Sequence, residues 1–372
     1  MAPTLTIPSE LLPADGRFGC GPSKIRPEAV ARLAEVAGGL LGTSHRKPGV
    51  KGEVARLQES MADLFGLPEG YEVLLTLGGA TAFWEAAAFG LVDRRSRHYT
   101  FGEFSSKFAK ATAAAPWLDD PDVVAADPGT RPEASAAPEG VDVQAFTHNE
   151  TSTGVMQDPV RTDDALVLVD ATSGAGGLPV DLAATDVYYF SLQKGFASEG
   201  GLTVAIVSPA AVERIERIAA SDRYIPTFLD LKTALDNSRQ NQTYNTPSVS
   251  TVFLAAEQVD WMRATYGDLA GVVEAQRAKA GHVYGWAHER DWASPFVTDE
   301  EARSLVVATI DIDEAISADD INAVLRANGV LDTDAYRKLG RNQLRIGMFP
   351  AVDAADLEAY TATVDWVVEQ LA

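Results

Sequence analysis

The sequence has a single cysteine, Cys20, among 372 residues. One thiol cannot form a disulfide within the chain and cannot build a cysteine-based zinc site, so both kinds of cross-link are excluded. A low cysteine content is typical of a reducing compartment, and we expect a cytoplasmic protein. A chain of this length can bury a substantial core without such cross-links.

Long apolar runs are also missing. No stretch approaches the roughly 18 residues that a membrane-spanning helix needs, so we expect no membrane partner. The segment before Arg17 has no basic residue and no apolar core, which argues against a secretory signal. The five histidines show no HExxH spacing, and we expect no metal site.

Positive charge is scarce: 31 lysine and arginine residues stand against 53 acidic ones, and the formal net charge is −22. Such a surface repels nucleic acid and anionic membranes, so we expect neither as a partner. An acidic excess is a common means of keeping a protein in solution. If the substrate is an anion, a local cluster of basic residues must reverse the field at its site.

The composition, with 46% hydrophobic and 23% charged residues, is that of a globular protein. In the first half, short apolar segments alternate with helical patterns, which favours an α/β fold with a mostly parallel sheet. Strands are predicted at 73–77, 98–101, 141–146, 165–169, 187–190 and 202–207. Apolar residues at three-to-four spacing predict a helix that ends at Gly66, and an alanine-rich segment predicts another over 82–91.

Residues 111–140 are rich in alanine, aspartate and proline, and we expect a surface excursion there. After about residue 250 the pattern changes, and it indicates a smaller α+β unit that ends in an amphipathic helix. Its other predicted elements are helices over 251–265, 269–289 and 318–327 and strands over 305–310 and 344–348. A cleft between two such units is a usual place for a ligand.

The most informative segment runs from Asp170 to Gly201. Asp170 ends one predicted strand, and Lys194 follows the next strand inside a glycine-flanked turn. Ligands of open α/β sheets bind at the carboxyl ends of strands, so both side chains are predicted to face one crevice. Apolar surroundings would lower the pKa of the lysine, and pyridoxal phosphate needs such an amine and an acid for its ring nitrogen. On these two residues alone, a surface lysine and a helix-capping aspartate are an equal alternative.

Three further strand ends carry residues suited to the same cofactor. Gly78 and Gly79 precede a helix, whose first N–H groups can hold a phosphate; simple capping is the alternative. Phe104 can stack on a planar ring or pack in the core. The segment HNETSTG offers Thr151 as a partner for the cofactor's phenolic oxygen or for the lysine, with a plain turn as the alternative.

Together these segments resemble the phosphoserine aminotransferases, class V enzymes of fold-type I that use pyridoxal 5'-phosphate, and most of all their actinobacterial branch. The matching stretches are GRFGCGPSKIRPE, GTSHRKPGVK, LGGATAFWEAA, GEFSSKF, HNETSTG, DATSGAGGLPVD, FSLQKGFASEGG, NQTYNTPSV and YRKLGRNQLRIGMFPA. The resemblance implies a large cofactor-binding domain over 26–262, with a mostly parallel central sheet. It also implies a small domain formed by 1–25 and 263–372.

The resemblance implies a role for each residue at the cofactor. Lys194 would form the Schiff base, and Asp170 would pair with the ring nitrogen. The other implied cofactor contacts are Ala80, Thr81 and Gln193 at the phosphate, Phe104 on the ring, Thr151 near the ring hydroxyl, and Asn245 and Thr246 at the phosphate of the neighbouring subunit. A homodimer with shared active sites follows. Phe104 departs from the tryptophan of many relatives, and Ala80 from the arginine of some.

The implied reaction interconverts O-phospho-L-serine and 2-oxoglutarate with 3-phosphooxypyruvate and L-glutamate, in L-serine biosynthesis. Each substrate carries two anionic groups, so the site needs two anion clamps. Arg345 resembles the family arginine that binds the α-carboxylate, a task for which a bidentate guanidinium is suited. His45 and Arg46 are implied to form the second clamp. Three basic residues are candidates to help them: Arg337, Lys338 and Arg341.

Three alternatives stay open. Another class V aminotransferase, such as one for alanine or serine with glyoxylate, would not need a phosphate clamp, so Arg46→Ala would spare its activity. A cysteine desulfurase needs a nucleophilic cysteine on a mobile loop, and Cys20 near the N-terminus fits this poorly. A non-catalytic binding protein of the same fold is disfavoured, because both Asp170 and Lys194 are present.

Overall fold

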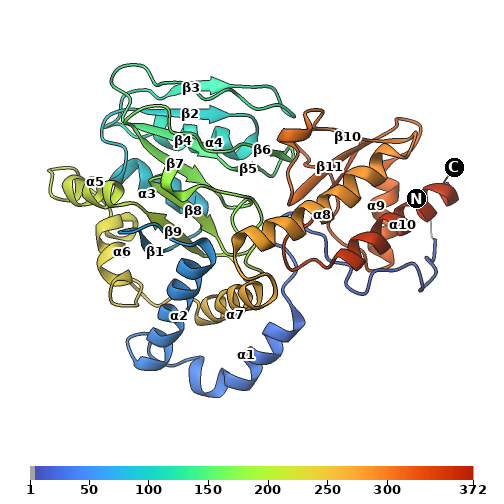
Figure 1. The fold of residues 1–372 in the computed structure, drawn as a ribbon, viewed down its shortest axis with the longest axis horizontal. Helices are drawn as coiled ribbons and strands as arrows, with labels where there is room; N and C mark the ends of the chain where they lie inside the picture. The colour runs from blue at the N-terminus through green and yellow to red at the C-terminus, as the bar shows by residue number, and fades with distance from the viewer. Residues whose placement is uncertain (1–4, 372) are drawn as a thin grey trace.

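The larger part of the molecule is built around a seven-stranded sheet with the order β1-β9-β8-β7-β4-β2-β3 (Figure 1). The structure is a computed structural model that describes residues 5–371. The strands of the sheet are β1 (Glu72–Leu77), β2 (Ser96–Thr100), β3 (Asp122–Ala125), β4 (Val143–Thr147), β7 (Leu166–Asp170), β8 (Val187–Ser191) and β9 (Leu202–Val207). Strand β9 runs antiparallel to both neighbours, and the other pairings are parallel. The predicted α/β class with a mostly parallel sheet is confirmed.

Helices cover both faces of this sheet because its central strands are apolar on both sides. Along β8, Val187 and Tyr189 belong to one hydrophobic cluster, and Tyr188 and Phe190 belong to another. This alternation follows from the two-residue period of a strand. The first cluster includes α3 (Ala80–Gly90), α4 (Glu103–Ala113), α5 (Pro209–Ala219) and α6 (Leu231–Ser238), and the second includes α2 (Pro48–Phe65) and α7 (Val249–Tyr266).

Helix α2 ends as its sequence predicts. Gly66 follows its last residue with φ 58° and ψ 58°, the left-handed conformation that glycine adopts without a steric penalty. Helix α1 (Pro27–Leu40) lies against α2 and α7 on the outside of the sheet (Figure 1).

The C-terminal part is a smaller α+β unit, drawn in orange and red in Figure 1. Its antiparallel sheet contains β10 (Ala293–Pro295), β11 (Val307–Ile312) and β12 (Gln343–Gly347), and its helices are α8 (Leu269–His288), α9 (Ala318–Ala327) and α10 (Ala354–Leu371). The N-terminal segment joins this unit: Ile7 N–H donates to Asn328 Oδ1 at 3.0 Å. The division into 26–262 and the remaining residues stays a prediction; its boundary falls inside α7, and residues 1–4 and 372 lie outside the described chain.

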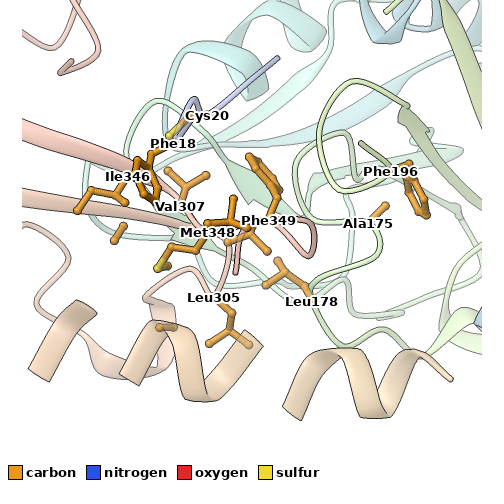
Figure 2. Packing of buried hydrophobic residues seen from close by; sticks show 14 of the residues in the cluster. Phe18, Cys20, Ala175, Leu178, Phe196, Leu305, Val307, Ile346, Met348 and Phe349 are labelled. Carbon is orange, nitrogen blue, oxygen red and sulfur yellow. The ribbon is translucent and has the colours of Figure 1, made fainter. Parts of the chain in front are cut away.

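The hydrophobic core continues from one part to the other. Phe18, Ile346 and Phe349 of the smaller unit belong to one buried cluster with Leu178 and Phe196, which follow strands of the large sheet. Figure 2 shows part of this cluster, with Phe349 near Leu178. These side chains are all 0–1% exposed. This shared hydrophobic core joins the two parts of the molecule.

One expectation needs correction. Residues 111–140 are not only a surface excursion, because β3 (Asp122–Ala125) adds a parallel edge strand to β2. Its residues alternate between half-buried and exposed, so the apolar signal is weak, as is usual at a sheet edge. Other elements that the sequence reading left unassigned are α1, α4, α5, α6, β10, the hairpin of β5 (Asn149–Glu150) and β6 (Val155–Met156), and short 3₁₀ helices at Leu182–Ala184, Thr227–Leu229 and Glu300–Ala302.

None of the helices within residues 5–371 combines the length and the apolar character needed to cross a bilayer.

Candidate active site

The carboxyl ends of β1, β2, β4, β7 and β8 lie at the same edge of the sheet, because these strands run in one direction. The loops that follow them enclose a cavity of about 290 Å³. Several residues predicted from the sequence line it: Ala80, Thr81, Phe104, Thr151, Asp170, Gln193 and Lys194. The expectation that Asp170 and Lys194 face one crevice therefore agrees with the geometry.

Lys194 lies in the turn after β8 and is 7% exposed. Its Nζ donates to Thr151 Oγ1 at 2.9 Å and lies 5.3 Å from the centroid of the Phe104 ring. Burial lowers the pKa of Lys194 to about 8, although the nearby Asp170 carboxylate acts in the opposite direction. The amine is therefore neutral in a useful fraction of molecules near neutral pH.

The N-terminal segment packs directly on this lysine. A Cβ placed on Gly21 would lie 2.4 Å from Lys194 Cε, and the φ of Gly21 is +133°, which side chains rarely adopt. Ser23 Oγ donates to the Lys194 carbonyl oxygen at 2.7 Å, and Ser23 N–H donates to the Gln193 carbonyl at 2.9 Å. The GPSK stretch, matched in sequence but given no role, thus forms a wall of the cavity.

Asp170 is the last residue of β7 and is 4% exposed. Its Oδ2 accepts a hydrogen bond from Trp84 Nε1 at 2.8 Å, and its Oδ1 accepts one from Thr172 N–H at 3.0 Å. Trp84 also lines the cavity. The sequence reading missed Trp84, because no local pattern links a helix residue to an aspartate 86 positions later.

A small polar network supports the lysine. Thr151 Oγ1 donates to Ser173 Oγ at 2.8 Å, and Asn149 Nδ2 donates to the same oxygen at 3.0 Å. Asn149 Oδ1 is buried and has no hydrogen-bond partner within residues 5–371. Buried acceptors are normally satisfied, so this oxygen is available to a donor on a ligand.

The loop between β1 and α3 has the features of an anion site. Gly78 and Gly79 have φ values of 113° and 93°, a backbone conformation that requires glycine. Helix α3 begins at once, and Ala80 N–H donates to Ser191 Oγ at 2.7 Å at the end of β8. Gln193, on the neighbouring turn, lines the same cavity, and its side-chain Nε2 can donate to an anion. A helix N-terminus with glycines before it suits a phosphate group.

Phe104 is held at the cavity by the start of α4. The buried carboxylate of Glu150 accepts hydrogen bonds from Phe104 N–H at 3.1 Å and Ser105 N–H at 2.9 Å, which caps this helix. On its other side, the Phe104 ring lies 6.1 Å from the ring of Tyr336, between centroids. The capped start of α4 and the neighbouring Tyr336 ring therefore position the Phe104 ring.

Arg345, on β12 of the smaller unit, lies beside the cavity. Its Nη1 donates to the Thr151 carbonyl oxygen at 3.2 Å, and its guanidinium lies 5.3 Å from the centroid of the Tyr336 ring. Its Nε is buried and has no acceptor among the residues that the structure describes. A donor left in this state is suited to a carboxylate of a ligand.

A wider basic cavity of about 1150 Å³ adjoins Arg345 and is also lined by Arg337, Lys338 and Arg341. Lys338 Nζ lies 2.5 Å from Glu103 Oε1, and Arg341 pairs with Asp311 at 2.6 Å. Both cations are exposed, so these pairs contribute little stability and can exchange for another anion.

Four predicted residues lie elsewhere on this chain. His45 Nδ1 is 3.1 Å from Thr246 Oγ1, and Arg46 Nη1 donates to Gln242 Oε1 at 2.9 Å. Arg46, Asn245 and Thr246 are exposed and His45 is half-buried, and none of the four lines the Lys194 cavity within residues 5–371. Their roles in binding stay predictions.

The sequence is similar to that of known proteins. The family model for aminotransferase class-V matches residues 18–332, so the fold and the match define a class V aminotransferase. The chain is 58% identical over 376 residues to a phosphoserine aminotransferase of a Nocardioides species, with 100% of both chains covered. It is 57% identical to the phosphoserine aminotransferase of Corynebacterium glutamicum, with 98% of this chain and 97% of that one covered.

Solved structures show the same fold. The phosphoserine aminotransferase of Cytophaga hutchinsonii superposes with a TM-score of 0.86 at 25% identity, covering 95% of this chain and 99% of that one. The enzyme from Bacillus circulans subsp. alkalophilus gives a TM-score of 0.84 at 23% identity, covering 96% and 99%. Within class V, the chain belongs to the phosphoserine aminotransferase family, as the sequence resemblance predicted.

Proposed function

We propose that this protein catalyses the reversible transamination between O-phospho-L-serine and 2-oxoglutarate, giving 3-phosphooxypyruvate and L-glutamate, with pyridoxal 5'-phosphate bound at Lys194. The observation that carries this proposal is the pair of a buried Lys194 amine and a buried Asp170 carboxylate lining one cavity. The reaction would serve L-serine biosynthesis in the cytoplasm. When bound, the cofactor supplies an aldehyde and an electron-withdrawing ring.

The residues present fit this cofactor. The glycine loop before α3 would hold the phosphate group, and Asp170 would face the ring nitrogen. The unpartnered Asn149 Oδ1 and Gln193 Oε1 are buried polar atoms, without partners in residues 5–371, that a bound polar group would satisfy. The cavity of about 290 Å³ lies close to the lower end of the range for small-molecule sites.

Lys194 would act first as the covalent anchor and then as a base. Its lowered pKa of about 8 makes the neutral amine accessible near physiological pH. Once released from the cofactor, Nζ would take the proton from the substrate Cα, a task that needs a pKa near the working pH. The hydrogen bond to Thr151 Oγ1 would hold Nζ in place for this transfer.

Two sets of basic residues would bind the substrate's anionic groups. Arg345, with its unpartnered Nε in the described chain, would bind the α-carboxylate. His45 and Arg46 of the neighbouring subunit would bind the second anionic group, with help from Lys338, Arg341 or Arg337, which line the adjoining basic cavity. Because the pairs of Lys338 with Glu103 and of Arg341 with Asp311 are exposed, a phosphate could replace these carboxylates at small cost.

A homodimer would bring His45, Arg46, Asn245 and Thr246 of one subunit to the cavity of the other. Two exposed aromatic residues support this arrangement, since Phe228 is 50% and Tyr244 46% exposed. A Cβ on Gly78 would lie 3.8 Å from the Phe228 ring, so this apolar surface borders the phosphate loop. Aromatic residues at the surface are common in protein interfaces.

Cofactor binding provides the first test. The purified protein should be yellow or should become yellow when pyridoxal 5'-phosphate is added, and borohydride reduction should attach the cofactor to the peptide that contains Lys194. Lys194→Ala should abolish the attachment, while Lys279→Met, at another buried lysine, should not. A protein that stays colourless with added cofactor would contradict the proposal.

Substrate identity provides the second test. A coupled assay with O-phospho-L-serine and 2-oxoglutarate should show transamination, and alanine or serine with glyoxylate should be much slower. Arg46→Ala should raise the KM for phosphoserine by about tenfold, the loss expected for one charged hydrogen bond. It should leave the reaction of an amino acid without a second anionic group, such as alanine, nearly unchanged. An Arg46→Ala variant that reacts with phosphoserine as well as the parent does would favour another class V activity.

A further inference from the structure

We propose that Trp84 is a positioning residue for the transamination, because its indole N–H fixes the Asp170 carboxylate in the cavity. The inference rests on the proposed function, in which Asp170 faces the ring nitrogen of the cofactor. It adds a residue of α3 that touches neither the reacting amine nor the substrate clamps described above.

The hydrogen bond from Trp84 Nε1 to Asp170 Oδ2 is 2.8 Å long and joins two buried side chains, 5% and 4% exposed. Oδ1 of the same carboxylate accepts from Thr172 N–H at 3.0 Å. Each oxygen therefore has one neutral donor, and the plane of the carboxylate is set from two sides. A buried charge needs such partners, since its loss of hydration is costly.

A neutral donor suits this position for an electrostatic reason. An arginine or lysine partner would cancel the negative charge of Asp170, whereas an indole N–H stabilises the carboxylate and leaves its charge in place. That charge is what an acid needs in order to hold a proton on a nearby ring nitrogen. Trp84 is itself held by packing, with its ring stacked on Phe108 at 6.3 Å between centroids and 19° between planes.

Helix α3 then connects two ends of the cavity. At its first residue, Ala80 N–H bonds Ser191 Oγ at the end of β8, and one turn later Trp84 bonds Asp170 at the end of β7. The same rigid helix thus sets the distance between the phosphate loop and the acid. Precise spacing of this kind is a requirement for positioning a ligand with two fixed contact points.

Trp84→Phe removes the donor and keeps an aromatic ring, and Trp286→Phe is a matched control. Trp286 is also 5% exposed and donates to an aspartate, Asp365, at 2.9 Å, but it belongs to α8 in the smaller unit. The dissociation constant for pyridoxal 5'-phosphate, measured by the visible band on titration, should rise about tenfold in Trp84→Phe, as expected for a lost hydrogen bond to a charged group. It should stay within about twofold of the parent in Trp286→Phe.

Steady-state kinetics at saturating cofactor give an independent readout. For Trp84→Phe we expect kcat to fall about tenfold and the KM for phosphoserine to stay within about twofold, because the substrate clamps are untouched. Replacing Trp84 by benzothienylalanine, in which sulfur takes the place of the indole N–H, keeps the ring shape and removes the donor. This variant should reproduce the weaker cofactor binding and the lower kcat even if the phenylalanine variant folds poorly.

The outcomes separate the two proposals. If the parent binds cofactor and transaminates while the Trp84 variants match it in cofactor affinity and kcat, the inference is wrong and the proposed function stands. If Trp84→Phe and Trp286→Phe raise the dissociation constant for the cofactor equally, the effect at Trp84 is general destabilisation and the inference is also wrong. If the parent itself takes up no cofactor, the proposed function fails and the inference falls with it.

Discussion

Two buried lysines, Lys194 at the large sheet and Lys279 on α8, share several properties and differ in one decisive respect. Both are 5–7% exposed, and burial lowers the pKa of Lys194 to about 8 and that of Lys279 to about 7. Each also lines a cavity of similar size, about 290 Å³ and about 280 Å³. Burial, a lowered pKa and a cavity therefore do not by themselves define a reactive amine.

The difference lies in the partners of the two amines. Lys279 Nζ donates to the backbone carbonyls of Phe349 and Val352, at 3.1 and 3.0 Å, and so ties α8 to the loop after β12. Two acids, Asp353 and Glu358, line its cavity, and Asp353 is already paired with Lys24 at 2.8 Å. Lys194 instead shares its cavity with a carboxylate held by neutral donors. We therefore predict that Lys279 has a structural role and that Lys194 is the reactive amine.

The largest expected effect tests this assignment directly. Lys194→Ala should reduce transamination by about 10⁴-fold, because it removes both the covalent anchor and the base. Lys279→Met should keep activity within a few-fold of the parent when both are assayed well below their unfolding temperatures. Comparable losses in the two variants, in the coupled phosphoserine assay, would erase the distinction.

The glycines beside each lysine should differ next. Gly21→Ala places a Cβ 2.4 Å from Lys194 Cε at a φ of +133°, so we expect activity to fall about 10²-fold through misplacement of the amine. Gly281→Ala, two residues after Lys279, is the matched control, since its Cβ would meet nothing within 4 Å. It should leave kcat unchanged. A fully active Gly21→Ala would show that Lys194 needs no wall there.

For stability we expect the opposite order, with the larger loss in the free energy of unfolding at Lys279. Lys279→Met leaves the carbonyls of Phe349 and Val352 without their amine donor, and we expect a loss of about 2 kcal/mol in the free energy of unfolding. Lys194→Met removes a buried amine from a functional site and should change this free energy by less than about 1 kcal/mol. Urea unfolding at pH 9 measures both, and a larger loss in Lys194→Met would contradict the comparison.

The smallest effect is a pH dependence. The pKa of Lys279 is about 7 in the folded protein and near 10.5 when unfolded, so between these values the unfolded state binds more protons. Stability from this group is therefore lowest below pH 7 and rises with pH up to about 10. The stability deficit of Lys279→Met should grow from pH 7 to pH 9, where it should reach about 2 kcal/mol. Using the difference between parent and variant cancels the other titrating groups, and a deficit that shrinks over this range would refute the assignment.

Much of the site was accessible from sequence because its main residues follow recognisable strand ends. Asp170 and Lys194 each come after an apolar strand, and Gly78 and Gly79 come before a helix. Parallel strands place their carboxyl ends at one edge, so these positions converge without any knowledge of side-chain contacts. The resemblance to relatives then supplied the family, and the comparisons confirm it.

Contacts between distant residues were out of reach of the sequence reading. Trp84 and Asp170 are 86 positions apart, and Gly21 meets Lys194 from 173 positions away. Trp84 reads as one more apolar residue of an alanine-rich helix, and Gly21 as part of a turn. The edge strand β3 was missed for a different reason, since half-exposed residues give little apolar alternation.

The amino-acid order by itself determined the layered α/β fold, the placement of candidate site residues at strand ends and the excess of negative charge, because these depend on local periodicity and residue type. Only the tertiary structure decided which of Lys194 and Lys279 shares a cavity with a carboxylate held by neutral donors, and which indole and which glycine lie against that pair. The physical reason is that hydrogen-bond geometry and steric contact act over a few ångströms in space, between segments whose separation along the chain carries no trace of their proximity.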